Sequence, residues 1–298
     1  MVSKVTPTSE QQAPGARLAV FVALMKPRII ELLLITTVPA MVIAADGWPG
    51  TWLVVNTLVG GILSAGGANA INNYVDRDID ELMERTAHRT LPRHQVEPDV
   101  ALRFGVILGV AGFVWLWVTT NLLAAVISTL ALLFYVFVYT MLLKRTTPQN
   151  IVIGGAAGAA PALVGWAAVE GSLALPAWIL FALVFFWTPP HFWALSLKYK
   201  DDYARAGIPM LPVVAGVART TRQIMIYTFI VVLISFALVP VADMRWLYLS
   251  VAAVLGMWFI VEAARVHLKP ERAMKLFSFS NIYLAVVLAS AWLDVALG

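Results

Sequence analysis

Long apolar stretches alternate with short polar connections along most of the chain. The apolar stretches fall near residues 29–45, 51–72, 101–119, 121–142, 151–169, 175–197, 223–241, 246–266 and 276–296. Each has enough residues to cross about 30 Å of hydrocarbon as a helix that rises about 1.5 Å per residue. The pattern therefore predicts an all-α integral membrane protein, a bundle of nine transmembrane helices.

Basic residues gather on one side of this predicted bundle. If the N-terminus is cytoplasmic, every lysine and arginine except Arg245 falls on the cytoplasmic side. The positive-inside rule then predicts a cytoplasmic N-terminus and a C-terminus outside. The formal net charge of +4 follows from this topology, so no nucleic-acid partner is needed to explain it.

Composition supports one membrane domain in contact with the lipid bilayer. Hydrophobic residues make up 60% of the chain and charged residues 13%, about half the share usual in soluble domains. Residues 1–17 lack an apolar core and are expected to form a disordered cytoplasmic tail, which leaves residues 18–298 as a single domain. Cysteine is absent, which excludes thiolate metal sites and thiol nucleophiles.

Two polar segments interrupt the apolar pattern, at residues 73–100 and 198–222. They follow the second and sixth predicted helices, so both are expected to form loops that cap the cytoplasmic side. The loops expected outside are short. The chemistry of the protein is therefore predicted at the cytoplasmic face.

A row of oxygen ligands enters the first polar segment. Asn72, Asp76 and Asp80 are spaced by four residues, which places them on one face of a continuing helix. Mg²⁺ is usually held by one or two carboxylates, with substrate phosphates and water completing its octahedron. The alternative is a solvated acidic loop whose charges pair locally with Arg77 and Arg85.

Cations follow both acidic groups. Arg85, Arg89 and Arg93 offer planar donors for phosphate oxygens. In the second polar segment Asp202 lies four residues after Lys198. Acids and cations on the same side favour a site for a metal diphosphate. Between the fourth and fifth predicted helices lie two more basic residues, Lys144 and Arg145, whose position favours a role as membrane anchors.

Two stretches, "NNYVDRDIDELMERTAHRTLP" and "WTPPHFWALSLKYKDDYARAGIPMLPVV", resemble the UbiA superfamily of intramembrane prenyltransferases, in particular members that farnesylate heme. The resemblance implies a Mg²⁺-dependent transfer of the farnesyl group of farnesyl diphosphate to a vinyl group of heme B. Water addition would give heme O for terminal oxidase assembly. It also implies a bacterial cytoplasmic (inner) membrane location, and heme A synthase or oxidase assembly proteins as partners.

The same resemblance implies roles for individual residues. Asn72, Asp76 and Asp80 would form the first metal-diphosphate site, and Asp202 would belong to the second. Arg85 and Arg89 would bind the diphosphate. Many superfamily members carry a second acid where this chain has Lys198, which suggests that this lysine binds phosphate directly.

Two apolar stretches carry further candidates. Pro189 and Pro190 are expected to break the sixth helix within the membrane. His191 beside them is a candidate heme ligand, or a buried histidine bonded to a freed carbonyl. Gly154 and Gly158 form a GxxxG pattern, for which helix packing is the favoured role.

Two other functions remain open on the residues alone. A sister enzyme could prenylate an aromatic acid or a quinone precursor. A transporter would also use intramembrane polar groups, but the polar residues here gather at one face and do not run through the bilayer.

Overall fold

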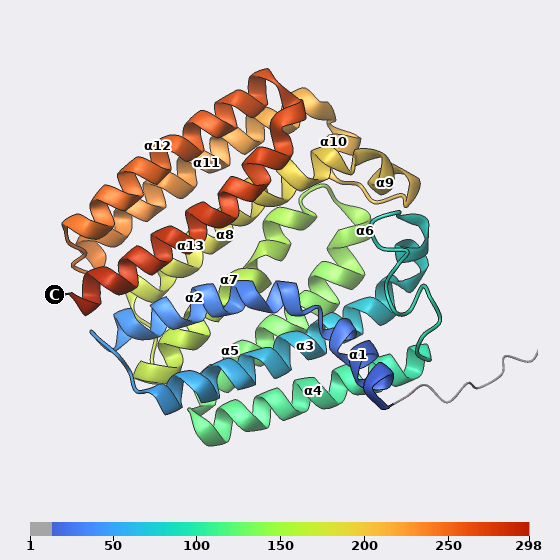
Figure 1. The fold of residues 1–298 in the computed structure, drawn as a ribbon, viewed down its shortest axis with the longest axis horizontal. Coiled ribbons are helices and arrows are strands. Elements are labelled where there is room, and N and C mark those ends of the chain that lie inside the picture. The colour runs from blue at the N-terminus through green and yellow to red at the C-terminus, as the bar shows by residue number, and fades with distance from the viewer. Residues whose placement is uncertain (1–13, 298) are drawn as a thin grey trace, which may run out of the picture.

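The protein is a bundle of long helices (Figure 1). The structure is a computed structural model that describes residues 14–297, with side chains described outside 14–17, 28–29 and 31–34. The helices are α1 Pro14–Met25, α2 Pro27–Ala44, α3 Thr51–Leu82, α4 Pro98–Thr119, α5 Leu122–Leu133, η1 Phe134–Leu143, α6 Lys144–Thr146, α7 Asn150–Glu170, α8 Leu175–Lys198, α9 Lys200–Arg205, α10 Leu211–Val214, α11 Gly216–Val241, α12 Trp246–Leu268, η2 Pro270–Arg272 and α13 Ala273–Ala296.

Within the described residues, eight helical stretches are long and apolar enough to cross a membrane. They coincide with the last eight apolar stretches of the sequence, and α5, η1 and α6 together form one of them. The first predicted crossing corresponds to α2, whose described stretch Ile35–Ala44 is a shorter apolar helix. The all-helical membrane fold is therefore confirmed, and the ninth crossing stays a prediction.

Close helix packing orients the helix that carries the acids. A side chain on Gly67 of α3 would lie 2.6 Å from the carbonyl oxygen of Gly105 on α4. Only glycines at this crossing let the two backbones approach so closely. The contact fixes α3 against α4, so one face of α3 is left toward the interior of the bundle.

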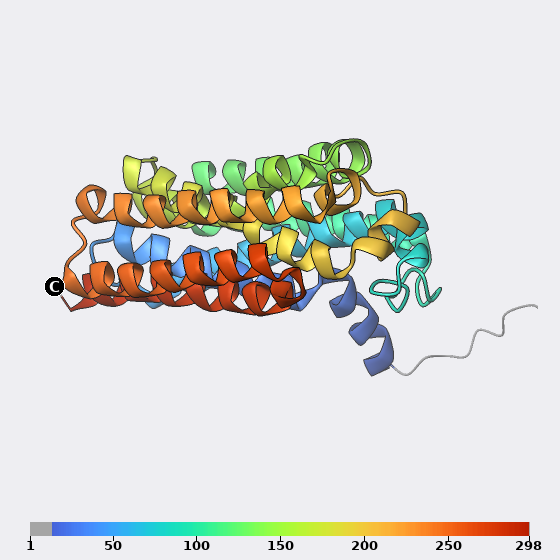
Figure 2. The ribbon, with the colours of Figure 1, turned by 90° about the horizontal axis from the view of Figure 1, so that it is seen from above.

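Both polar segments lie at one end of the bundle, and the second of them includes α9 and α10 (Figure 1). The chain leaves α3 and α8 at that end, whereas the C-terminus lies at the opposite end. The view from above shows α1 projecting from the same end as the polar segments (Figure 2). The two segments, far apart in the sequence, are thus in position to build one site.

α1 was not expected from the sequence. It begins at Pro14, so residues 14–17, expected in the tail, lie in a helix, while residues 1–13 lie outside the described residues. Leu24, at the end of α1, is fully buried, and its carbonyl oxygen accepts a hydrogen bond of 3.0 Å from Asn73. This end of α1 is therefore packed against α3.

The predicted break at Pro189 and Pro190 is wrong. α8 runs without interruption from Leu175 to Lys198 through both prolines. Each proline removes one backbone N–H, but α7, α11 and α13 pack around α8 and hold it. Thr188 also donates its hydroxyl to the carbonyl of Val184 at 2.9 Å. Neighbouring helices therefore maintain the helix that the local sequence disfavours.

Candidate active site

The row of predicted ligands lies on one buried face of α3. The helix continues ten residues past the predicted end of the apolar stretch, which keeps Asn72, Asp76 and Asp80 in register. All three side chains are buried, and Asp76 has no exposed surface. These side chains therefore do not form a solvated loop. Arg77, the expected local ion-pair partner of the acids, donates to the carbonyl of Tyr74.

Asp76 is the centre of a polar network. Its Oδ2 accepts hydrogen bonds from Asn72 Nδ2 at 2.6 Å and from Lys144 Nζ. Its other oxygen, Oδ1, is buried and has no hydrogen-bond partner among the described residues. Lys144, expected to be a membrane anchor, therefore belongs to the site, whereas Arg145 mainly binds the exposed Asp78 through two 2.7 Å contacts.

Lys26 closes the network from the junction of α1 and α2. Its backbone has a φ of 54°, and its Nζ donates to Asn72 Oδ1 at 2.6 Å. Burial lowers the pKa of Lys26 well below its usual range, and the charge of Arg89 lowers it further, whereas Asp80 and Asp76 raise it. An anion bound here would favour the charged lysine. Sequence reasoning gave Lys26 no role, because 46 residues separate it from Asn72.

Asp80 is covered by the first polar segment. Arg89 Nη1 donates to Asp80 Oδ2 at 2.6 Å, as a phosphate-binding arginine beside the acids would. Thr86 donates to the Asp80 carbonyl at 2.9 Å, which holds the loop over the end of α3. Asp80 Oδ1 is buried, and no residue in the described part of the chain donates a hydrogen bond to it.

Asp202 joins the two polar segments. It is buried on α9 and accepts hydrogen bonds from the backbone N–H of Arg85, at 3.3 Å, and from Arg205. The guanidinium of Arg85 donates to the hydroxyl of Tyr203 at 3.3 Å and lies near the ring of Tyr199. Arg85 belongs to the first polar segment, and these contacts link that segment to the second.

Two predicted phosphate ligands lie away from these contacts. Lys198 and Arg93 are exposed, and neither side chain makes a hydrogen bond or ion pair with any other part of the chain that the structure describes. α8 ends at Lys198 and α9 begins at Lys200. Lys198 and Asp202, four residues apart, therefore lie on different helices. The structure gives Lys198 no contact with the acids.

A π-helical segment lies beside the acids. η1 spans ten residues, and the Thr140 hydroxyl donates to the carbonyl of Tyr135, five residues before it, at 2.8 Å. Lys144 follows Thr140 by four residues, as Asp76 follows Asn72, and this spacing keeps each pair on one face of its helix. Thr140 there accepts a hydrogen bond from Asn72 at 3.1 Å.

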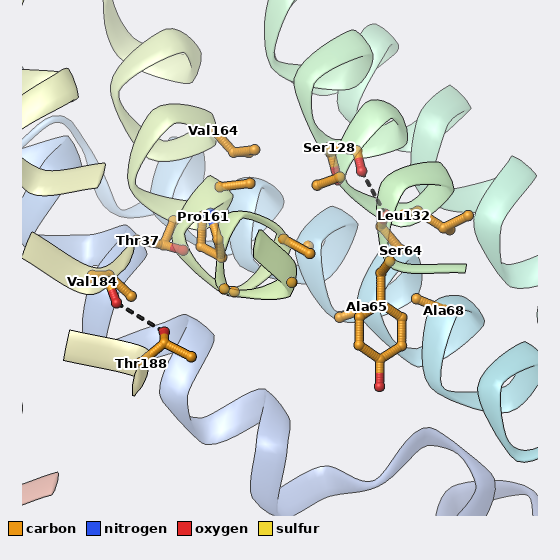
Figure 3. A pocket seen from close by; sticks show the side chains of 18 of the residues that line it. Thr37, Ser64, Ala65, Ala68, Ser128, Leu132, Pro161, Val164, Val184 and Thr188 are labelled. Carbon is orange, nitrogen blue, oxygen red and sulfur yellow. Dashed lines mark hydrogen bonds between the residues drawn. The ribbon is translucent and has the colours of Figure 1, made fainter. Parts of the chain in front are cut away.

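An apolar chamber of about 250 Å³ begins near the acids. Asn69, Tyr135 and Tyr139 line it nearest to the polar network, and the rest of its wall is largely small or aliphatic. Figure 3 shows Val184 and Thr188 on one side of the pocket and Ala65 and Ala68 on the other.

The two glycines of the GxxxG pattern have different roles. A side chain on Gly154 would meet the ring of Tyr139 at 2.3 Å, so this glycine permits packing. A side chain on Gly158 would meet nothing within 4 Å, and Gly158 lines the chamber. Packing alone therefore does not explain Gly158.

Known proteins share this sequence and fold. The UbiA prenyltransferase family matches residues 33–287. The chain is 51% identical to protoheme IX farnesyltransferase 2 of Saccharopolyspora erythraea, over 95% of this chain and 89% of that protein. The chain belongs to the UbiA prenyltransferase family. It is an intramembrane prenyltransferase.

Solved structures of this fold are more distant in sequence. A digeranylgeranylglyceryl phosphate synthase aligns with a TM-score of 0.79 at 20% identity, over 95% of this chain and 99% of that one. A UbiA homologue from Archaeoglobus fulgidus bound to DMAPP and Mg²⁺ aligns with a TM-score of 0.65 at 14% identity, over 91% of this chain and 98% of that one. At these identities they support the fold.

The free carboxylate oxygens of this UbiA-family site fit a hard cation. Asp76 Oδ1 and Asp80 Oδ1 are buried acceptors that receive no hydrogen bond from the described residues, with Arg145 Nη2 3.9 Å from Asp76 Oδ1, and such atoms are costly unless a ligand satisfies them. The described residues contain no group of three acidic, histidine or cysteine side chains that could hold a metal. Mg²⁺ here would need oxygen atoms from its substrate, as it does in many phosphate sites.

Proposed function

We propose that this enzyme transfers the farnesyl group of farnesyl diphosphate to a vinyl group of heme B, with addition of water, giving heme O. The observation that carries the proposal is a buried acid and cation network on the same helix, α3, as Asn69, which lines an apolar chamber, in a chain half identical to protoheme IX farnesyltransferases. Asn72, Asp76 and Asp80 would hold Mg²⁺ at the diphosphate, with Asp202 in a second site.

The residues of the network suit the departure of diphosphate. Mg²⁺ would supply charge neutralisation for the leaving oxygens. Lys26, Lys144 and Arg89 place positive charge around the same point, so they stabilise the charge that develops as the farnesyl C–O bond breaks. Arg85 anchors the covering loop, and Lys198 is proposed to bind diphosphate from the exposed end of α8.

The chamber suits the allylic cation that remains. Its apolar wall keeps water from the cation until the terminal vinyl carbon of heme attacks it and forms the new C–C bond. The positive charge then lies on the carbon next to the porphyrin. Water adds there and loses a proton, which leaves a hydroxyethyl group. No nucleophilic side chain is required.

Gly158 is expected to set the length of the prenyl chain that the chamber accepts. Gly158→Leu should lower turnover with farnesyl diphosphate at least ~10-fold and spare geranyl diphosphate, because the leucine would extend into open chamber space. Steady-state assays with the two donors measure the ratio. Gly158→Ala is the matched control and should behave as the wild type. Equal use of both donors by Gly158→Leu would place the prenyl chain elsewhere.

The proposal includes nine crossings of a bacterial cytoplasmic membrane, with α2 as the first and residues 18–298 as one domain. The site would face the cytoplasm, the N-terminus would lie inside and the C-terminus outside. Heme O would pass to heme A synthase or oxidase assembly proteins as partners.

Topology can be tested because the chain has no cysteine. Single cysteines at positions 47 and 172 should react with an impermeant thiol reagent in intact cells, and cysteines at 86 and 205 should not. Permeabilised cells provide the control for reactivity at position 205, because Arg205 is exposed whereas Thr86 is buried. Labelling of position 205 from outside would place the site on the opposite face.

One assay tests the reaction itself. Purified protein incubated with heme B, farnesyl diphosphate and Mg²⁺ should give a porphyrin whose mass has increased by a farnesyl group and a hydroxyl group, and EDTA should abolish the product. Product with an aromatic acid or quinone precursor, and none with heme, would assign the enzyme to the aromatic-acceptor relatives. Transport without prenylation would favour the transporter.

A further inference from the structure

His191 is held in one orientation by aromatic rings on both faces. The ring centroid of Trp187 lies 4.3 Å from the imidazole, and that of Phe277 lies 4.4 Å away on α13. Both rings are close to parallel with the imidazole, at 19° and 25°. The imidazole cannot turn without displacing one of them.

Ser280 determines which ring nitrogen carries the proton. His191 Nδ1 lies 2.8 Å from Ser280 Oγ, and Ser280 donates its own proton to the carbonyl of Phe277 at 2.7 Å. The serine oxygen can therefore only accept from the imidazole, so Nδ1 is the protonated nitrogen. This bond also replaces the expected one between His191 and a freed carbonyl.

The other nitrogen, Nε2, keeps its lone pair. His191 lines the chamber, and Nε2 makes no hydrogen bond with the described residues. Trp187 Nε1 donates to the carbonyl of Ser280 at 2.8 Å, which binds α8 to α13 at this level. This second hydrogen bond fixes the backbone of Ser280 next to the imidazole.

A neutral imidazole with one nitrogen fixed by a hydrogen bond is the form that binds a metal. Metal-binding histidines generally donate their second ring N–H to an acceptor, which sets the tautomer and the ring direction. Action as a base would create an imidazolium in an apolar chamber, which is costly. The geometry therefore favours a ligand over a proton acceptor.

We propose that Ser280 is a positioning residue that presents His191 Nε2 as an axial ligand to the iron of the porphyrin acceptor. This inference rests on the proposed function, because it requires a metalloporphyrin in the chamber. It adds the ligand's tautomer and the residue of α13 that maintains it.

The test compares heme with metal-free protoporphyrin IX on purified protein. Ser280→Ala should weaken heme binding about 10–100-fold and alter the Soret band, while metal-free protoporphyrin binding stays unchanged because no iron is present. Ser290→Ala is the matched control: Ser290 is also buried on α13 and donates to the carbonyl three residues before it, at 2.8 Å. It should change neither measurement.

His191→Ala should also shift or weaken the Soret band, and His191→Gly should recover it with added imidazole. An unaltered heme spectrum in Ser280→Ala and His191→Ala would overturn the inference and leave heme farnesylation standing. Equal weakening of both porphyrins by Ser280→Ala would also overturn it, since the serine would then only support packing. Failure of the wild type to bind either porphyrin would refute the heme acceptor as well.

Discussion

Asp76→Asn and Asp80→Asn are each expected to lower prenyl-transfer turnover at least ~100-fold, which corresponds to about 2.7 kcal/mol of lost transition-state stabilisation. Each change keeps the shape of the side chain and removes one charge from a pair of buried carboxylates with free oxygens. Asp202→Asn should have a similar effect if the second segment completes the site. Steady-state kinetics with varied Mg²⁺ provides the measurement.

Asp99→Asn is the matched control for these variants. Asp99 is exposed in the first turn of α4, and its side chain makes no hydrogen bond or ion pair to any described residue. Turnover of this variant, and of Glu97→Gln beside it, should stay near the wild-type value. Thermal unfolding in detergent separates lost chemistry from lost fold. Near-normal turnover of Asp76→Asn and Asp80→Asn would refute metal-diphosphate chemistry at this site.

Lys144→Gln is expected to reduce kcat/KM for farnesyl diphosphate at least ~100-fold, because it removes a buried positive charge next to Asp76. The adjacent Arg145→Gln should cost at most about threefold, since a largely exposed ion pair is worth only about 1 kcal/mol or less. The two variants remove the same charge at neighbouring positions, so their ratio compares the direct contact of Lys144 with Asp76 to the 3.9 Å approach of Arg145 Nη2 to Asp76 Oδ1. Small effects of both variants would mean that both residues serve as membrane anchors.

The sequence by itself determined the helices and the row of acids. An apolar stretch of about 20 residues is sufficient to predict a membrane helix, because lipid offers backbone groups no hydrogen-bond partners. The spacing of Asn72, Asp76 and Asp80 predicted a shared face, because the helical period is local. Arg89 was predicted to bind diphosphate, and it lies nine residues from Asp80, close enough in sequence for the covering loop to bring the two together; its binding of diphosphate stays a prediction.

The tertiary structure decided which other groups meet these acids. Lys144 reaches Asp76 across 68 residues, because its helix packs against α3. Lys198 was expected at the site and is exposed, because α8 ends before Asp202. Lys26 and Ser280 contact Asn72 and His191 across 46 and 89 residues. Such contacts depend on how helices pack, which no local spacing records.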